Sequence, residues 1–274
     1  MMTARDPHRF VNELDDTAIN RLIDRLESRA RDGVFTRLVD KYTEKLLAAN
    51  PARVLEVGCG TGAMIRSFAR CREFTGKAVG VDQSQQFLDA AGNFASQENL
   101  EGKLEFQLGD AHHLDFPNAC FDVVIANTLI SHVTEPTKVL REMARVVREG
   151  GILAIFDGDY ASLTYAHPDH EFGVRMDQSL AVASFNNPRI MRDLPAIIGR
   201  YGLKLHSAWG DAVVEIGKGS YFKSFAETYA PYVVNAGLMT SQEVDGWLSA
   251  QRDAMDRGTF FACCNYYAYL MHSS

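Results

Sequence analysis

The stretch that most constrains the fold of this chain is VLEVGCGTGAM, residues 54–64, in which a short apolar run breaks into three closely spaced glycines. The apolar residues favour a β-strand, whereas Gly58, Gly60 and Gly62 let the backbone turn and let the main chain approach a ligand closely. A helix that begins near Gly62 would direct the positive end of its dipole at the same place, which favours a carboxylate or phosphate group. The stretch therefore predicts a strand, a tight turn and a helix start around a bound small molecule.

The glycines alone leave the ligand open. GCGTGA also satisfies the dinucleotide pattern GxGxxG/A, with Ala63 in the last position. Two acids accompany the turn: Glu56 lies two residues before Gly58, and Asp82 lies 24 residues after Gly58 in the strand-like run KAVGVDQS. In a nicotinamide-dependent oxidoreductase, Asp82 would bind the adenosine ribose. The glycine turn and the acid Asp82 fit an oxidoreductase as well as any other nucleotide-binding class. The later parts of the chain therefore decide which ligand is expected.

The composition favours small-molecule chemistry. A chain of 274 residues can hold one large α/β domain with insertions and a substantial core. Its 28 Lys and Arg against 35 Asp and Glu give a net charge of −7, which disfavours nucleic acid and anionic membranes as partners. Five cysteines without regular spacing, and a start without the apolar core of a signal peptide, predict a cytoplasmic location. Neither a membrane span nor a metal site is predicted.

Strand-like and helical segments alternate from residue 51 to residue 157, which is typical of a doubly wound sheet. The strands are predicted at residues 54–57, 78–81, 104–108, 123–126 and 152–156, and the helices between them at 64–71, 85–96 and 136–148. Ligands of such sheets gather at the carboxyl ends of the strands. The candidate site residues are therefore those that directly follow the predicted strands.

Three later motifs resemble those of class I S-adenosylmethionine-dependent methyltransferases. LEFQLGDAHHLDF contains the GDA triplet that follows the family's third strand, FDVVIANTLISHV matches its fourth strand, and REMARVVREGGILAIFD matches the next helix and the fifth strand. Together with VLEVGCGTG and VGVDQS, they are most similar to the branch that includes ubiquinone and menaquinone C-methyltransferases and many small-molecule methyltransferases. The fourth-strand segment lacks the NPPY or DPPY signature of adenine-N6 enzymes, so nucleic acid is not the expected substrate.

This resemblance implies S-adenosyl-L-methionine as the cofactor and a Rossmann-like α/β fold, with a doubly wound sheet of seven mostly parallel strands, the last one antiparallel. It implies that Asp82 binds the two ribose hydroxyls and that Asp110 approaches the exocyclic amine of adenine. The implied cofactor-binding residues are Glu56, Gly58, Cys59, Gly60, Gly62, Asp82, Gln83, Gly109, Asp110, Ala111 and Asn127.

Around the matching region we expect an N-terminal helical cap over residues 1–50 and a methyltransferase domain over residues 51–274. Two insertions, at about 160–200 and 215–258, are rich in Tyr and Phe and would suit a helical lid over an apolar or aromatic substrate. They could equally be plain elaboration of the fold.

The predicted function is transfer of a methyl group to O, N or C of a small, apolar or aromatic molecule of quinone or secondary-metabolite type. The alternatives are an NAD(P)-dependent oxidoreductase and a noncatalytic cofactor-binding subunit. His132 follows the fourth strand and is the candidate base, because imidazole titrates near neutrality; alternatively it is a pocket wall without chemistry. Tyr42, Asp159 and Tyr160 are candidates for substrate contact. A small-molecule substrate is the expected partner, and a homodimer is left open.

Overall fold

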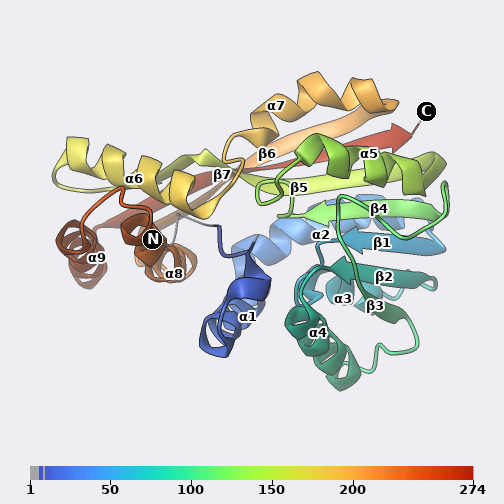
Figure 1. Cartoon of the computed structure of the whole chain (residues 1–274), viewed down its shortest axis with the longest axis horizontal. Helices are drawn as coiled ribbons and strands as arrows, with labels where there is room; N and C mark the ends of the chain where they lie inside the picture. The colour runs from blue at the N-terminus through green and yellow to red at the C-terminus, as the bar shows by residue number, and fades with distance from the viewer. Residues whose placement is uncertain (1–5, 9, 274) are drawn as a thin grey trace.

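The computed structural model describes residues 6–8 and 10–273, and in this part of the chain seven strands form one sheet in the order β3-β2-β1-β4-β5-β7-β6 (Figure 1). The strands are β1 (Arg53–Val57), β2 (Lys77–Asp82), β3 (Leu104–Leu108), β4 (Phe121–Asn127), β5 (Val147–Tyr165), β6 (Leu203–Gly217) and β7 (Phe260–Ser273). Neighbours from β3 to β5 are parallel, whereas β7 runs antiparallel to β5 and β6. The predicted doubly wound sheet with an antiparallel last strand is confirmed, and its strand order reverses between β1 and β4, where such sheets bind ligands.

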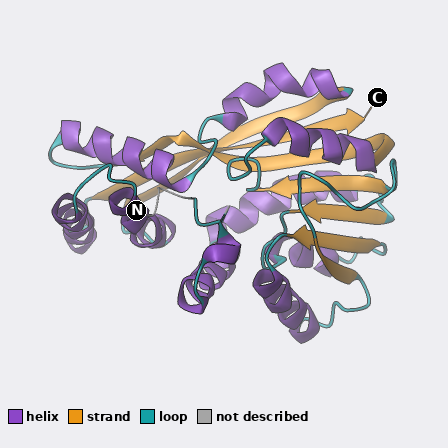
Figure 2. Cartoon of the chain, viewed as in Figure 1, coloured by secondary structure: helices purple, strands orange, loops and turns teal. Residues whose placement is uncertain are grey.

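Helices cover both faces of this sheet (Figure 2). The helices of the first face are α2 (Gly33–Leu47), α3 (Ala63–Arg70) and α4 (Gln85–Gln97), and those of the second are α5 (Pro136–Val146) and α7 (Ile190–Ile197), which leads into η2 (Ile198–Tyr201). Val54 and Val123 pack toward the first face, and Leu55 and Val124 pack toward the second. Because both faces are buried, the central strands read as continuous apolar runs, which is why they were visible in the sequence.

The strands β5, β6 and β7 continue beyond the core sheet and carry a separate group of helices (Figure 1). These helices are α6 (His170–Ser184), α8 (Tyr221–Asn235) and α9 (Ser241–Asp256). The ring of Tyr165, at the end of β5, lies 4.9 Å from that of Trp247 on α9 and 5.8 Å from that of Phe222 on α8. Aromatic packing therefore fixes this helical layer to the extended strands.

One boundary differs from its prediction. The helix between the fourth and fifth strands is predicted to reach residue 148, but α5 ends at Val146 because Val147 pairs with Phe121 and begins β5. The first insertion contains two helices that pack in different places. Of these, α6 joins the aromatic helical layer. The other, α7, buries Met191 and Leu194 on the second face of the core sheet.

The N-terminal segment places a helix over the carboxyl ends of the strands, where the glycine turn lies. After η1 (Val11–Glu13) comes helix α1 (Asp16–Arg31). Its N-cap is Asp15, whose side chain accepts a hydrogen bond from the Ala18 N–H. Ile19 and Leu22 of α1 pack against Phe87 of α4, so α1 lies over the end of the sheet rather than on either face. Within the described residues, no helix combines the length and the apolarity that a membrane crossing would require.

Candidate functional site

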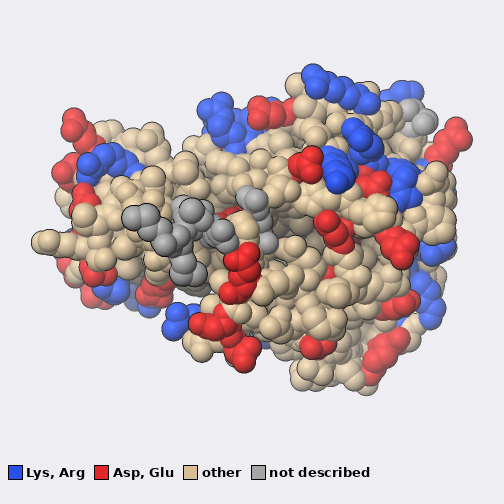
Figure 3. Space-filling model, in the orientation of Figure 1, with Lys and Arg blue, Asp and Glu red and all other residues tan. Residues whose placement is uncertain are grey.

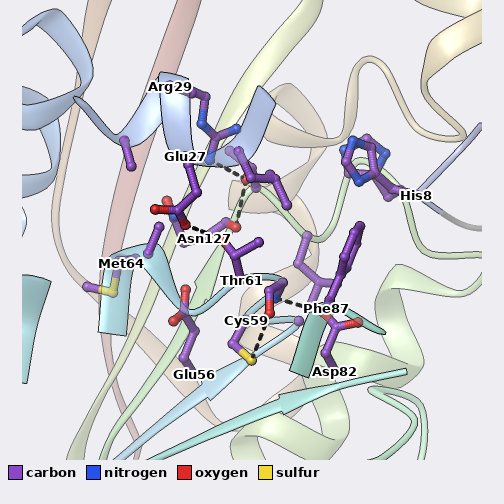
Figure 4. A pocket seen from close by; sticks show the side chains of 18 of the residues that line it. His8, Glu27, Arg29, Glu56, Cys59, Thr61, Met64, Asp82, Phe87 and Asn127 are labelled. Atoms are coloured by element: carbon purple, nitrogen blue, oxygen red, sulfur yellow. Dashed lines mark hydrogen bonds between the residues drawn. The ribbon is translucent and has the colours of Figure 1, made fainter. Parts of the chain in front are cut away.

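A cavity of about 730 Å³ lies between the carboxyl ends of the central strands, α1 and the aromatic helical layer (Figure 4). This volume falls within the usual range for small-molecule sites. The cavity is lined by ten of the eleven predicted cofactor residues, namely Glu56, Gly58, Cys59, Gly60, Asp82, Gln83, Gly109, Asp110, Ala111 and Asn127. His132 and Tyr160 also line it, so residues from five strand ends meet in one space.

The glycine turn has a shape that a side chain would prevent. Gly58 has a φ of +68°, and a Cβ there would lie 2.4 Å from Cδ1 of Leu129, which follows β4. Gly62, the predicted residue that does not line the cavity, has a φ of +70° and begins α3, and a Cβ there would lie 2.7 Å from the Phe106 ring of β3. Gly58 thus lets the turn pack beneath the cavity, and Gly62 lets α3 pack on the sheet.

Asp82 ties this turn to the end of β2. Its Oδ2 accepts a hydrogen bond from the Gly60 N–H at 2.8 Å, and its Oδ1 accepts one from the Ser84 N–H at 3.0 Å. Burial raises the pKa of Asp82, while these backbone hydrogen bonds oppose the shift. The Gln83 N–H gives Asp82 a third backbone hydrogen bond. A carboxylate offers about four acceptor positions, so roughly one remains for a ligand in the cavity.

Glu56 is a buried acid below the same turn. Its Oε2 accepts a hydrogen bond from the Ile65 N–H at 3.1 Å. Burial raises the pKa of Glu56 to about 8; the nearby charge of Asp82 adds to this rise, and the hydrogen bond from Ile65 opposes it. The cavity therefore contains an acid whose ionisation would be favoured by a cationic ligand.

Helix α1 adds polar side chains that the sequence interpretation missed. Glu27 accepts a hydrogen bond from the Thr61 hydroxyl at 2.6 Å and pairs with Arg66 of α3 at 2.6 Å, and it is 6% exposed. Arg29 donates to the Thr128 hydroxyl at 2.8 Å, directly after β4 (Figure 4). The only signal in the sequence was a set of charged residues interleaved with the apolar stripe of this helix, which is usually a solvated face.

A second cluster surrounds His132 and includes the N-terminal segment. Nδ1 of His132 lies 2.6 Å from Oδ2 of Asp6, and the two groups form a buried ion pair when the imidazole is protonated. The ring of His8 lies 4.7 Å from that of His132, and its Nε2 lies 3.0 Å from the hydroxyl of Tyr229 on α8. Neither Asp6 nor His8 was predicted, because a single acid and a single histidine near the start of a chain carry no pattern.

The two histidines have opposite proton affinities. Burial lowers the pKa of His132, but the charge and hydrogen bond of Asp6, with the charge of Asp157, outweigh burial and raise it overall. Burial holds the pKa of His8 well below its usual value, and the charges of His132, Arg29 and Arg25 act in the same direction. His132 is therefore the better proton acceptor of the two.

The part of the cavity beside α6 and α8 is lined by aromatic side chains. Tyr160 stacks on Phe185 with ring centroids 3.4 Å apart, and the ring of Phe225 lies 6.0 Å from that of Phe185. Tyr160 reaches this position where the pairing of β5 with β7 shifts between Asp159 and Thr164. An apolar or aromatic ligand would contact ring faces here.

Two of the predicted substrate residues lie outside the cavity. Tyr42 on α2 is 1% exposed, and its ring packs 5.5 Å from that of Phe156, so it belongs to the core. Asp159 is 1% exposed and pairs with Arg192 of α7 at 2.7 Å, on the other side of β5 from Tyr160. Side chains alternate between the two faces of a strand, so Asp159 points away from the cavity although its neighbour Tyr160 lines it. Among residues 6–8 and 10–273, no group of three or more His, Cys, Asp or Glu side chains is arranged to hold a metal ion.

Known proteins with related sequences identify the domain. Residues 55–155 match the family model described as "Methyltransferase domain". With the strand order and the glycine turn, this match defines the class: the chain carries a class I S-adenosylmethionine-dependent methyltransferase domain. The matched region contains the glycine turn and the first five strands of the sheet, up to Ile155.

The matches to individual proteins extend this picture. An uncharacterized 37.1 kDa protein in transposon TN4556 of Streptomyces fradiae is 28% identical over 239 residues, covering 82% of this chain and 65% of that protein. Methyltransferase GfsG of Streptomyces halstedii is 37% identical over 121 residues, covering 44% of this chain and 43% of GfsG. The chain thus spans less than two thirds of either relative. The crystal structure of the [4+2]-cyclase SpnF shares the fold, with a TM-score of 0.56 at 21% identity, covering 86% of this chain and 80% of that one.

Proposed function

We propose that this protein transfers a methyl group from S-adenosylmethionine to a small acceptor with an apolar or aromatic body. The observation that carries the proposal is one continuous cavity, with the glycine turn and Asp82 at one end and the aromatic rings and His132 at the other. Its volume of about 730 Å³ leaves room for a nucleoside cofactor and a small acceptor together. The family model and GfsG are both methyltransferases, so they give the oxidoreductase interpretation no support.

The residues present fit the cofactor. Asp82 lines the cavity with a carboxylate that can accept a hydrogen bond from the cofactor ribose, and Asp110 and Ala111 line the cavity beyond β3, where we assign adenine. Glu56 and Arg29 offer groups of opposite charge for the two ends of an amino acid. When bound, S-adenosylmethionine supplies an electrophilic methyl group on a sulfonium.

The chain itself contributes positioning, exclusion of water and a place for a proton. Helix α1 and the lid helices enclose the cavity, and holding two reactants in line is worth roughly 7 to 11 kcal/mol of barrier. With Asp6 accepting a hydrogen bond from Nδ1–H of His132, the neutral imidazole keeps Nε2 as its basic atom. His132 would then take the proton that an acceptor hydroxyl or ammonium loses. For an acceptor that is already electron-rich, His132 serves as a wall of the pocket.

We also propose that residues 1–50 form a cap over a domain at residues 51–274. Helix α1 supports this division because it lies across the cavity and contacts both the glycine turn and α8.

Acidic and basic side chains are interspersed on the face shown in Figure 3. A cytoplasmic location, a homodimer and the absence of a nucleic-acid partner remain predictions.

Calorimetric titration with S-adenosylhomocysteine and with NAD tests the proposal. We expect S-adenosylhomocysteine to bind and NAD to bind far more weakly. Asp82 and the glycine turn can bind the ribose of either ligand, whereas Arg29 and Glu56 can bind only the amino-acid group, which NAD lacks. Preference for NAD would refute the methyltransferase assignment. Since a cyclase shares this fold, transfer of a radioactive methyl group from S-adenosylmethionine to an acceptor must also be observed.

A further inference from the structure

Arg25 of α1 is a buried cation with no acidic partner within residues 6–8 and 10–273. It lines the cavity and is 6% exposed, and among these residues its one hydrogen bond goes from NH1 to the Ser224 hydroxyl of α8 at 3.2 Å. Its Nε is buried and unpaired. Among the described residues the nearby acids are engaged elsewhere, since Glu27 pairs with Arg66 and Asp6 contacts His132.

The surroundings of Arg25 make this arrangement costly. A buried charge needs a partner, and Arg29, four residues further along the same helix, is a like charge that destabilises it. The partial compensation comes from ring faces, with the guanidinium carbon 4.6 Å from the Tyr221 centroid, 5.5 Å from Phe225 and 5.8 Å from Tyr229. A fold that needed only packing at this position would be served better by an apolar side chain.

Arg25 and Arg29 lie at different parts of the cavity. Arg29 donates to Thr128, directly after β4, and so faces the amino-acid end of the proposed cofactor site. Arg25 lies one turn earlier, against α8 and its aromatic side chains. Arg25 is therefore left for the second ligand of the cavity.

We infer that the methyl acceptor is an anion, carrying a carboxylate or phosphate that Arg25 binds, with its apolar or aromatic body against Phe185 and Phe225. A guanidinium with free donors in a water-poor aromatic chamber forms strong charge-assisted hydrogen bonds to either group. This inference rests on the proposed function and specifies its substrate class.

Matched pairs of small probes test the inference at pH 7.5 in protein saturated with S-adenosylhomocysteine. The probes are 3-phenylpropanoate, its neutral amide 3-phenylpropanamide, and 2-phenylethyl phosphate, with affinities measured by calorimetry. We expect the better anion to bind about 10- to 100-fold more tightly than the amide, as charge-assisted hydrogen bonds predict. The ratio between carboxylate and phosphate then tells which anion the site takes.

Three variants assign the preference to Arg25. Arg25→Met should abolish the preference for the anion, Arg25→Lys should retain part of it, and Arg21→Met on the exposed face of α1 should retain all of it. Equal affinity of anion and amide for the wild type, including no binding of either, overturns the inference, as does a preference that survives in Arg25→Met. Because the wild-type comparison needs no variant, a misfolded Arg25→Met leaves the test intact. Failure of S-adenosylhomocysteine itself to bind would instead refute the proposed function.

Discussion

Replacing Glu56 with Gln should make the ligand-free protein more stable at pH 8 and change little near pH 4.5. Burial raises the pKa of Glu56 from 4.5 to about 8, so between these pH values the folded protein binds more protons than the unfolded chain. Stability must then fall as pH rises through this window. The full shift corresponds to at most about 5 kcal/mol, which is a large part of the stability of an ordinary domain. Gln removes this penalty and can still accept the Ile65 N–H.

Urea unfolding followed by circular dichroism at pH values from 4.5 to 8.5 measures this effect. The wild-type curve also contains contributions from other buried acids such as Asp177, whose pKa burial raises to about 7, so the difference between wild type and Glu56→Gln isolates Glu56. Glu227→Gln, on the exposed side of α8, is the matched control and should run parallel to the wild type. Parallel curves for wild type and Glu56→Gln across the window would show that Glu56 is ionised in the folded protein and would refute the reasoning.

Four further substitutions test the proposed site. Asp82→Asn should weaken binding of S-adenosylhomocysteine about 10- to 100-fold in calorimetry, because charged acceptors are lost, and unchanged affinity would contradict the ribose assignment. Gly60→Val should abolish cofactor binding, because φ is +54° there and a Cβ would approach Leu26 at 3.2 Å; a folded variant with normal affinity would show that the turn is misassigned. His132→Ala should lower turnover by roughly 10² to 10⁴ with nearly unchanged cofactor affinity, and the pH–rate profile should lose its acidic limb. A changed KM at constant kcat would show instead that His132 only lines the pocket. Asp6→Asn should move that limb to lower pH, because the charge of Asp6 raises the pKa of His132; an unmoved limb would contradict this positioning role.

The fold, and the grouping of the residues that follow the strands around one cavity, could be predicted because each motif is local in sequence. The turn at Gly58 and Gly60 and the acid Asp82 follow strands whose apolar runs mark them, and parallel strands bring their carboxyl ends to one edge. The sequence could not tell which of two adjacent side chains on a strand points into the cavity. Tyr160 and Asp159 are adjacent, yet only Tyr160 lines the cavity, because side chains alternate across β5 and its pairing with β7 shifts there.

What the sequence by itself determined is the doubly wound sheet and the glycine turn with its two acids, since each follows from short-range periodicity and spacing. The antiparallel direction of the last strand was expected from the family resemblance, and the pairing of β7 with β5 and β6 confirms it. Only the tertiary structure decided which residues complete the cavity. Asp6 meets His132 across 126 residues, and Arg25 meets Ser224 across 199. Such contacts depend on how α1 and the lid pack over the strand ends, and that packing is fixed by buried side chains with no common pattern along the chain. The part of the cavity around Asp6, His132 and Arg25 therefore exists only in the folded molecule.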